Sequence, residues 1–437
     1  MAAPAKGVGV RLTRRGWWFL AAGVVAFVAA YAGGRLQLLY VACLLLALPL
    51  IALAVVALRR PRLAARRDFA PRVVQAGAVT TVSVVASNTA PGRSLPAVWW
   101  DRLPWHPWST PPGALRALEA RGPRFARNNA TTVLYDLAPP RWGIVPFGPL
   151  TVEVGDPFGM ATCRAIVGES ELLTVTPEVV PLADSGLSVP AGDGESRLVQ
   201  RRATGDEDDA MTREYRHGDA MRRVHWRASA RSGDLMVRQE EQRSFPEARI
   251  LVDTTRAGYR DAEGPFDAAE SDGFEWVVRM LASVAVHLRR TGFLVTIEET
   301  GPSQLDDVGR GRRRTWGDEE FLSRLASVHL TEAPALTPGT HTAAGPVFAI
   351  LGTAEPETID WMLTHRRPGE LAVAFVVRTS SAIDQIDRSF GVPSGASRLD
   401  EELADAGWLV VPVRADEDHA AAWQAVVAEL GRSRGSA

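Results

Sequence analysis

The sequence predicts a multi-domain membrane protein with an N-terminal transmembrane helical hairpin, a small β-sandwich and a doubly wound α/β domain. Two long apolar runs lie before residue 59, which indicates a membrane anchor. Short alternating runs separated by Pro and Gly come next, a pattern typical of a sandwich. Beyond Ala248, compact apolar runs alternate with amphipathic stretches, as in a parallel sheet covered by helices. The 437 residues leave room for roughly two or three globular domains beside the anchor.

The predicted anchor consists of apolar runs from Trp17 to Ala32 and from Leu36 to Leu58. Each run is close to the roughly 20 residues that cross a bilayer as a helix, and the break at residues 33–35 allows a tight turn. Arginines flank the runs on both sides: Arg11, Arg14, Arg15, Arg59, Arg60, Arg62, Arg66 and Arg67. The positive-inside rule therefore predicts a multi-pass protein of the cell membrane with both termini in the cytoplasm. Residues 1–67 form the predicted hairpin with its basic flanks.

A cleaved signal peptide is the alternative interpretation of the first run. Arg14 and Arg15 precede a short apolar core, and residues 30–32 match a small-x-small cleavage pattern. Even then, the second run and the arginines after it would anchor the product. The two cysteines are Cys43, inside an apolar run, and Cys163, so we expect no structural disulfide and a reducing compartment.

Residues 68–181 are predicted to form the β-sandwich. Apolar and hydroxyl residues alternate from Val79 to Val85, as a half-buried strand requires. Further strands are expected at 131–137, 150–154 and 172–175. The stretch from Ala114 to Ala120 is expected to form one or two helical turns. Four tryptophans, Trp99, Trp100, Trp105 and Trp108, are interpreted as core filling, with a membrane interface or ligand stacking as the alternatives.

Residues 248–437 are predicted to form the α/β domain. Compact apolar runs alternate with stretches in which apolar residues recur at helical spacing, which favours a mostly parallel sheet covered on both faces. The expected strands are 250–252, 293–297, 347–351, 371–377 and 409–412. The expected helices are 274–288, 318–328, 355–365, 398–406 and 419–430.

Residues 182–247 are predicted to form a polar linker followed by a distinctive arginine-rich segment, Arg213 to Arg238. The acidic run at 206–209 in the linker is interpreted as solvated surface charge, since no scaffold of other ligands surrounds it. In the arginine-rich segment, Asp219 is the predicted cap of a helix that starts at Ala220. Gly233 is the predicted end of that helix.

The predicted helix carries Arg223, Arg227 and Arg231 on one face, because they are four residues apart. Arg222 and Trp226 have the same spacing, so a cation stacked on a ring is expected. Three interpretations of the arginine face compete: internal ion pairs that clamp the domains, docking on an acidic partner, and nucleic-acid binding. The formal net charge of -2 makes nucleic acid the least favoured partner.

The order of elements in this segment is its most specific feature: Arg213, Tyr215, Gly218-Asp219, Arg222-Arg223, Trp226 and Ser229-Ala230-Arg231. In this order the segment resembles the signature of the domain-of-unknown-function 58 family. Upstream, the stretches 141–143, 147–149 and 156–159 resemble the second landmark of that family. The resemblance extends over the whole architecture, including the hairpin.

The resemblance implies a C-terminal domain similar to von Willebrand factor A domains. It also implies association with MoxR-type AAA+ ATPases and with transglutaminase-like membrane proteins. No established reaction comes with the family, whose members are usually treated as adaptors or assembly factors.

Von Willebrand factor A domains commonly hold Mg²⁺ with an Asp-x-Ser-x-Ser loop after the first strand. The equivalent residues here are 253–257, in which Asp253 and Thr255 match in type. Ala257 has no oxygen ligand, and Arg256 brings a positive charge to the loop. We therefore expect no cofactor, with Mg²⁺ at Asp253 and Thr255 as the weaker alternative.

The sequence contains no nucleophile elbow, no phosphate-binding loop with Lys and no His-Glu-x-x-His pair. The prediction is a membrane-anchored, non-enzymatic adaptor or assembly factor that presents its C-terminal domain to an ATPase or to membrane partners. The alternative is a hydrolase or other enzyme that holds an anionic ligand with the signature arginines.

Overall fold

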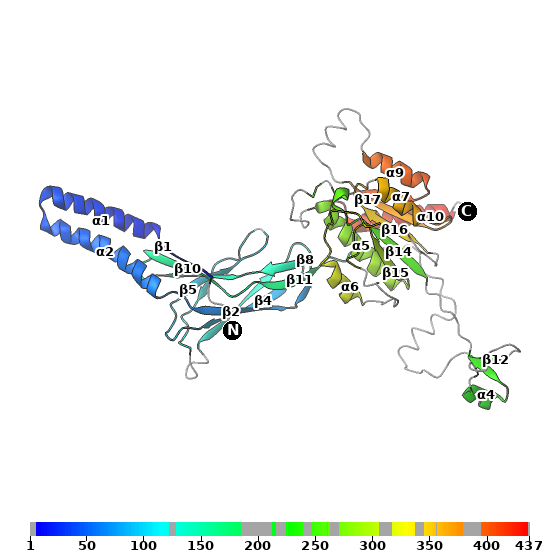
Figure 1. Ribbon diagram of the computed structural model, residues 1–437, viewed down its shortest axis with the longest axis horizontal. Helices are drawn as coiled ribbons and strands as arrows, with labels where there is room; N and C mark the ends of the chain where they lie inside the picture. The colour runs from blue at the N-terminus through cyan, green and yellow to red at the C-terminus, as the bar shows by residue number, and fades with distance from the viewer. Residues whose placement is uncertain are drawn as a thin grey trace. The chain divides into compact units, whose positions relative to one another are not determined.

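The structure is a computed structural model. It describes residues 6–105, 107–121, 128–184, 212–215, 224, 226–238, 246–259, 261–262, 271–305, 317–336, 345–354, 356–378 and 395–435. The chain divides into two compact units (Figure 1). The first unit comprises Met1–Glu178 with Glu319–Ser327, and the second comprises Val179–Asp318 with Val328–Ala437.

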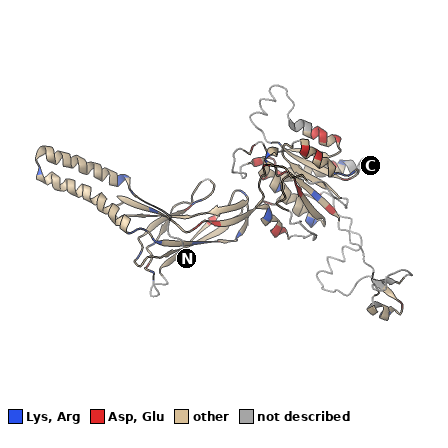
Figure 2. Cartoon of the chain, in the orientation of Figure 1, with Lys and Arg blue, Asp and Glu red and all other residues tan. Residues whose placement is uncertain are grey.

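The two predicted apolar runs form helices α1, Arg14–Gly33, and α2, Leu36–Leu58. Both helices are long and apolar enough to cross a membrane, and charged residues lie only at the ends of the pair (Figure 2). The Thr13 hydroxyl caps α1 by accepting a hydrogen bond from the Gly16 N–H at 3.2 Å. The helices approach closely at Gly23, where a Cβ atom would lie 2.8 Å from the side chain of Leu46.

The strands of the first unit form one five-stranded and two three-stranded sheets. The five-stranded sheet has the order β1 (Lys6–Leu12), β10 (Ala161–Val167), β9 (Leu150–Gly155), β5 (Ala97–Asp101) and β6 (Gly113–Leu115). The other sheets are β2 (Leu63–Ala70), β4 (Thr80–Asn88) and β7 (Ala130–Leu137), and β3 (Val73–Gln75), β11 (Glu171–Thr176) and β8 (Gly143–Phe147). All pairings are antiparallel except that of β3 with β11.

Side chains from all three sheets share one hydrophobic core, which includes Val84, Phe147, Val152 and Leu173. Full burial of each such side chain stabilises the fold by about 1.5–3 kcal/mol. The four predicted strands of the sandwich are confirmed as β4, β7, β9 and β11. The predicted helical turns at 114–120 are wrong, because this stretch begins in strand β6, which pairs with β5.

Three of the four clustered tryptophans are packed into the sandwich. Trp99 is 7% exposed and belongs to the core, Trp105 contacts Phe147, and Trp100 lies beneath the guanidinium of Arg164. Trp108, by contrast, is 66% exposed. Core filling therefore accounts for most of the cluster but not for Trp108.

The sandwich continues directly into both ends of the hairpin. Strand β1 precedes α1 and pairs with β10, a pairing that the sequence pattern did not reveal. Strand β2 begins at Leu63, five residues after α2 ends at Leu58, so the predicted boundary at residue 67 falls inside a strand. Both ends of the hairpin are thus held by neighbouring sheets of one folded unit.

The second unit contains a five-stranded sheet with the order β15 (Leu294–Glu299), β14 (Glu247–Val252), β16 (Val347–Leu351), β17 (Ala372–Arg378) and β18 (Leu409–Arg414). Every pairing in it is parallel. Its interior strands are buried along almost their whole length, as strands covered on both faces must be. The predicted strands are confirmed with shifts of a few residues at their ends.

Helices cover both faces of this sheet (Figure 1). On one face, Trp276 of α5 (Asp272–Arg290) and Trp423 of α10 (His419–Gly435) contact Phe375 of β17. On the other face, Met362 of α7 (Pro356–Thr364) and Leu403 of α9 (Gly395–Asp405) belong to a core that also contains alternate residues of the strands. The predicted doubly wound arrangement is therefore observed. Helix α6 is Asp318–Leu325, within the predicted range.

Candidate functional site

The arginine-rich segment forms a small folded element of its own. Strands β12 (Thr212–Glu214) and β13 (Met236–Arg238) pair antiparallel, with Arg213 opposite Val237. The Tyr215 N–H donates to the Leu235 carbonyl at 2.7 Å. Helix α4, Trp226–Ser232, is tied to β13 because the hydroxyl of Ser229 accepts a hydrogen bond from the Met236 N–H at 2.8 Å.

The predicted end of the helix is confirmed. Gly233 follows α4 with φ of 82°, a conformation that favours glycine, and its N–H donates to the Ser229 carbonyl at 3.0 Å. The described part of the helix begins at Trp226, whereas the predicted start was Ala220. The remaining predicted residues Gly218, Asp219, Arg222 and Arg223 lie outside the described residues.

Apart from Ser229, the described side chains of α4 are exposed to solvent. Trp226 is 66% exposed and Arg231 is also exposed. Arg213 and Arg227 are placed on β12 and α4 by their backbone, and their side chains lie outside the described residues. An exposed indole and guanidinium on one short helix form a surface that another molecule can contact, since Trp and Arg are the residues most enriched in binding hot spots.

The second notable region is the carboxyl edge of the parallel sheet. The strand order reverses direction at β14, whose neighbours β15 and β16 both follow it in sequence. Open α/β sheets usually bind ligands at such a point. Asp253 lies there, directly after β14, and is 1% exposed.

Asp253 is surrounded by threonine hydroxyls. Its Oδ1 accepts hydrogen bonds from the Thr255 N–H at 3.0 Å, the Thr255 hydroxyl at 2.7 Å and the Thr300 hydroxyl at 2.7 Å. Thr300 immediately follows β15, so these bonds join the ends of two neighbouring strands. Buried carboxylates require such compensation, because burial of an unbonded charge costs several kcal/mol, on the order of 3–5 for a broken buried pair.

The loop after β14 folds over the edge of the sheet. Its 3-10 turn, Arg256–Gly258, is held by the Thr353 N–H, which donates to the Gly258 carbonyl at 2.7 Å. The Tyr259 hydroxyl donates to the Asp253 carbonyl at 2.6 Å. Burial, reinforced by the nearby carboxylate of Asp253, raises the pKa of Tyr259 well above its ordinary value. Tyr259 is therefore a neutral hydrogen-bond donor at physiological pH.

The residues around Asp253 do not fit the Mg²⁺ loop described above. A Cβ atom on Gly258 would lie 2.0 Å from Asp253 Oδ2, so protein backbone occupies the space beside that oxygen. Ala257 contributes no side-chain oxygen, and the Arg256 guanidinium is paired with Glu332 at 2.8 Å. Among the described residues, no group of three or more His, Cys, Asp or Glu gathers in a metal-binding arrangement. The arrangement of Asp253 and Thr255 is that of a hydrogen-bonded structural junction.

The landmark stretches of the sandwich also acquire a physical role. In the turn at 156–159, Asp156 Oδ1 accepts from the N–H groups of Met160 and Ala161, both at 2.6 Å. The Thr13 hydroxyl donates to the Gly159 carbonyl at 2.6 Å, and the Thr13 N–H donates to the Met160 carbonyl at 2.8 Å. This turn therefore fixes the residue that caps helix α1.

The stretch 147–149 surrounds a buried ion pair. The Arg67 guanidinium donates to Asp101 at 2.6–2.9 Å and to the Phe147 carbonyl at 3.1 Å. A Cβ atom on Gly148 would lie only 2.5 Å from Nη2 of Arg67. The Tyr135 hydroxyl donates to Asp101 at 2.6 Å. Gly148 has φ of 85°, and both features restrict this position to glycine.

Arg67 lies in the predicted basic flank of the hairpin, and the structure corrects this prediction. The side chains of Arg67 and Asp101 are 3% and 0% exposed, so Arg67 is neutralised inside the sandwich and does not belong to the exposed basic flank of the hairpin. Sequence reasoning also missed Asp101, because its partner lies 34 residues away in another sheet. The only sequence signal was an isolated Asp in an otherwise apolar strand, Ala97–Asp101.

Comparisons with known proteins give limited similarity in overall structure. A CARDB domain of Pyrococcus furiosus, solved with two metal ions, aligns with 28% of this chain and 97% of its own at 11% identity and a TM-score of 0.18. A DNA-bound alkylpurine DNA glycosylase of Pseudomonas fluorescens covers 37% of this chain and 44% of its own at 11% identity, with a TM-score of 0.19. An exo-β-N-acetylglucosaminidase of Vibrio harveyi covers 80% and 75% at 9% identity, with a TM-score of 0.18. No curated protein matches the chain.

A family model does match the segment that contains both candidate regions. The match runs over residues 211–296, which include the β12–α4–β13 element, the Asp253 loop and helix α5. This agrees with the resemblance drawn from the order of the signature residues. Residues 211–296 carry the signature of the family described as protein of unknown function DUF58.

Proposed function

We propose that this protein is a membrane-anchored, non-enzymatic adaptor or assembly factor. Helices α1 and α2 would hold it in the cell membrane, with both termini in the cytoplasm. The β12–α4–β13 element and the α/β domain, which we take to be von Willebrand factor A-like, would present the docking surfaces. The observation that carries the proposal is the exposure of Trp226 and Arg231 within the family-matched segment.

The anchoring part of the proposal is supported by the way in which the hairpin is built into the sandwich. Residues at the base of α2, such as Ala52 and Val56, share a buried cluster with Ala161 and Cys163 of β10. Strand β1 enters α1 after the single residue Thr13. Such an anchor transmits the orientation of the membrane helices to the folded unit, which suits a protein that presents surfaces at a fixed place.

The docking part of the proposal is supported by the chemistry of α4. An exposed indole offers a large apolar area, and a guanidinium offers bidentate hydrogen bonds to carboxylates. A partner for this surface would carry an apolar pocket rimmed by acidic residues. A MoxR-type AAA+ ATPase and a transglutaminase-like membrane protein are the candidate partners.

Photo-crosslinking in native membranes tests the proposal. A photoreactive amino acid replaces Trp226 in the full chain, and in the matched control it replaces Trp108, which is equally exposed at 66% but lies in the sandwich. We expect position 226, but not position 108, to capture an AAA+ ATPase or a membrane-protein partner. Capture of neither from position 226, or equal capture from both positions, would contradict the proposal.

The capture should depend on the charge of the helix. Replacement of Arg231 by Gln should reduce the yield at position 226, because the partner would lose its contact with the guanidinium. An unchanged yield in the variant would remove the arginine from the docking surface.

A further inference from the structure

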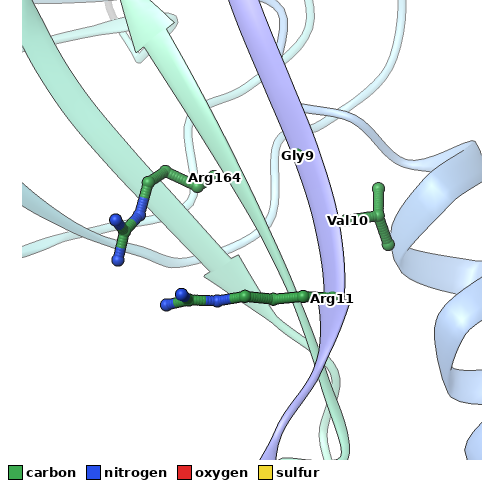
Figure 3. Close-up of a pocket in the computed structure, with 4 residues that line it drawn as sticks. All are labelled: Gly9, Val10, Arg11 and Arg164. Carbon is green, nitrogen blue, oxygen red and sulfur yellow. The ribbon is translucent and has the colours of Figure 1, made fainter.

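A shallow pocket lies where the first strand of the sandwich approaches the membrane helices. It has a volume of about 200 Å³ and is lined by Gly9, Val10, Arg11 and Arg164 (Figure 3). Gly9 lies opposite Arg164 in the pairing of β1 with β10, beside an irregularity in the register between Lys6 and Gly9. A Cβ atom on Gly9 would meet no atom within 4 Å, so glycine leaves the floor of the pocket open.

The pocket carries a surplus of positive charge. Arg11 Nη2 and Arg164 Nη2 both donate to a single oxygen, Oε2 of Glu153, at 3.2 and 3.1 Å. One carboxylate therefore holds two guanidinium groups in place and neutralises only one of them. The side chains of the two arginines are 59% and 44% exposed, so their remaining donors are available to an anion from solvent.

An aromatic ring completes the positioning of the second arginine. The Arg164 guanidinium lies over the ring of Trp100, 4.8 Å from its centroid. Stacking of this kind keeps the planar group extended over the sheet and leaves its edge free to donate hydrogen bonds. Arg164 is thus ordered from two directions, by Glu153 and by Trp100.

The pocket lies at the root of the hairpin. Val10 and Leu12 of β1 pack against the buried cluster that contains Ala52 and Val56 of α2. Arg11, between them, points to the opposite face of the strand (Figure 3). Three residues after Arg11 the chain enters α1, whose first turns expose Trp17 and Trp18 at 64% and 75%. Exposed tryptophans at a helix end are typical of the boundary between membrane and water.

We propose that this pocket binds the phosphate of an anionic phospholipid. Two ordered guanidiniums with one shared counter-charge suit a phosphodiester, and the position at the root of the hairpin suits a headgroup at the membrane surface. The inference rests on the membrane insertion of α1 and α2 proposed above. It adds a specific lipid contact to the general attraction of a basic flank.

Native mass spectrometry of the full chain in detergent tests the lipid site. The chain is mixed with phosphatidylglycerol, with phosphatidylcholine or with soluble glycerol phosphate. We expect selective retention of phosphatidylglycerol, and a loss of roughly fivefold in affinity for each arginine removed in R11Q and R164Q. The matched control is R72Q, because Arg72 is an exposed arginine paired with Asp68 on the same sandwich, and it should retain the lipid.

A second variant tests the pocket itself without a change of charge. G9V places a side chain into open space, so the fold should be unaffected while the headgroup is excluded. Equal retention of phosphatidylglycerol by G9V, R11Q, R164Q and R72Q would overturn the inference, as would equal binding of glycerol phosphate. Recovery of the unaltered chain from cells in the soluble fraction, without detergent, would instead refute the membrane anchor before any lipid is added.

Discussion

The buried pair of Arg67 and Asp101 makes the strongest prediction about the stability of the sandwich. In the variant D101A the Arg67 guanidinium, 3% exposed, would remain inside the sandwich without its carboxylate. The Tyr135 hydroxyl would lose its acceptor as well. Removal of one partner from a buried pair costs about 3–5 kcal/mol, which corresponds to a change of roughly 100-fold or more in the unfolding equilibrium.

Hydrogen exchange of the full chain in detergent measures this change where it occurs. The slowest amides of β4 and β9 should exchange roughly 100-fold faster in D101A, because their exchange requires unfolding of the sandwich. The control is D68A, since Asp68 lies next to Arg67 in β2 but pairs with Arg72 at the surface, and its loss should cost about 0–1 kcal/mol. The double variant R67M/D101L should recover most of the stability, because it leaves no buried charge. Exchange in D101A within about fivefold of the unaltered chain would refute the assignment of a buried, mutually dependent pair.

Three further predictions concern other sites. Burial lowers the pKa of His419 from 6.5 to about 4, so the folded state binds fewer protons than the unfolded state between these values. The contribution of His419 to the free energy of unfolding should therefore be constant above pH 6.5 and fall by about 3 kcal/mol as the pH drops to 4. In thermal unfolding measured across this range, H419F should abolish the pH dependence that this histidine causes. In G258A the new Cβ would lie 2.0 Å from Asp253 Oδ2, so denaturant unfolding of the α/β domain should show a loss of about 1–3 kcal/mol in the free energy of unfolding. An unchanged free energy would show that the loop can move aside. In D156A the N–H groups of Met160 and Ala161 would lose their acceptor, which should destabilise the turn by about 1.5–3 kcal/mol and accelerate the hydrogen exchange of both amides. Unchanged protection of these amides would show that the turn does not depend on Asp156.

Periodicity was sufficient to predict most of the fold. The interior strands of the parallel sheet are continuous apolar runs, and the apolar face of α5 repeats at helical spacing, so both are visible in local sequence. The two helices of the hairpin were equally clear, because α1 and α2 are each long and apolar enough to cross a membrane. In these cases the physical cause of the structure lies within the element itself.

The missed features depend on contacts between distant segments. Strand β1 contains two glycines, which weaken a local strand signal, and it becomes a strand because β10 offers it an edge. The stretch after Gly113 has helix-forming residues, yet pairing with β5 overrides that preference. Arg67 had the appearance of one more flanking arginine because Asp101 is its neighbour only after folding.

The candidate sites likewise include one feature that local sequence predicts and one that depends on distant residues. The end of helix α4 at Gly233 followed from a local rule for glycine, and the structure confirms it. The closure of the edge at Asp253 could not be predicted, because it depends on Thr300 and Thr353, each of which follows a different strand. The type of a residue indicates what it can bind, but only its neighbours decide what it does bind.

The central claim is that the hairpin of α1 and α2 holds the folded chain at the cytoplasmic face of the membrane. Protease accessibility tests this claim most directly. The protease is applied to intact cells and to inside-out membrane vesicles, and antibodies against the α/β domain detect the products. We predict that the domain stays intact in cells and is cleaved from the membrane in the vesicles. Release of the domain by protease added outside intact cells would contradict the account.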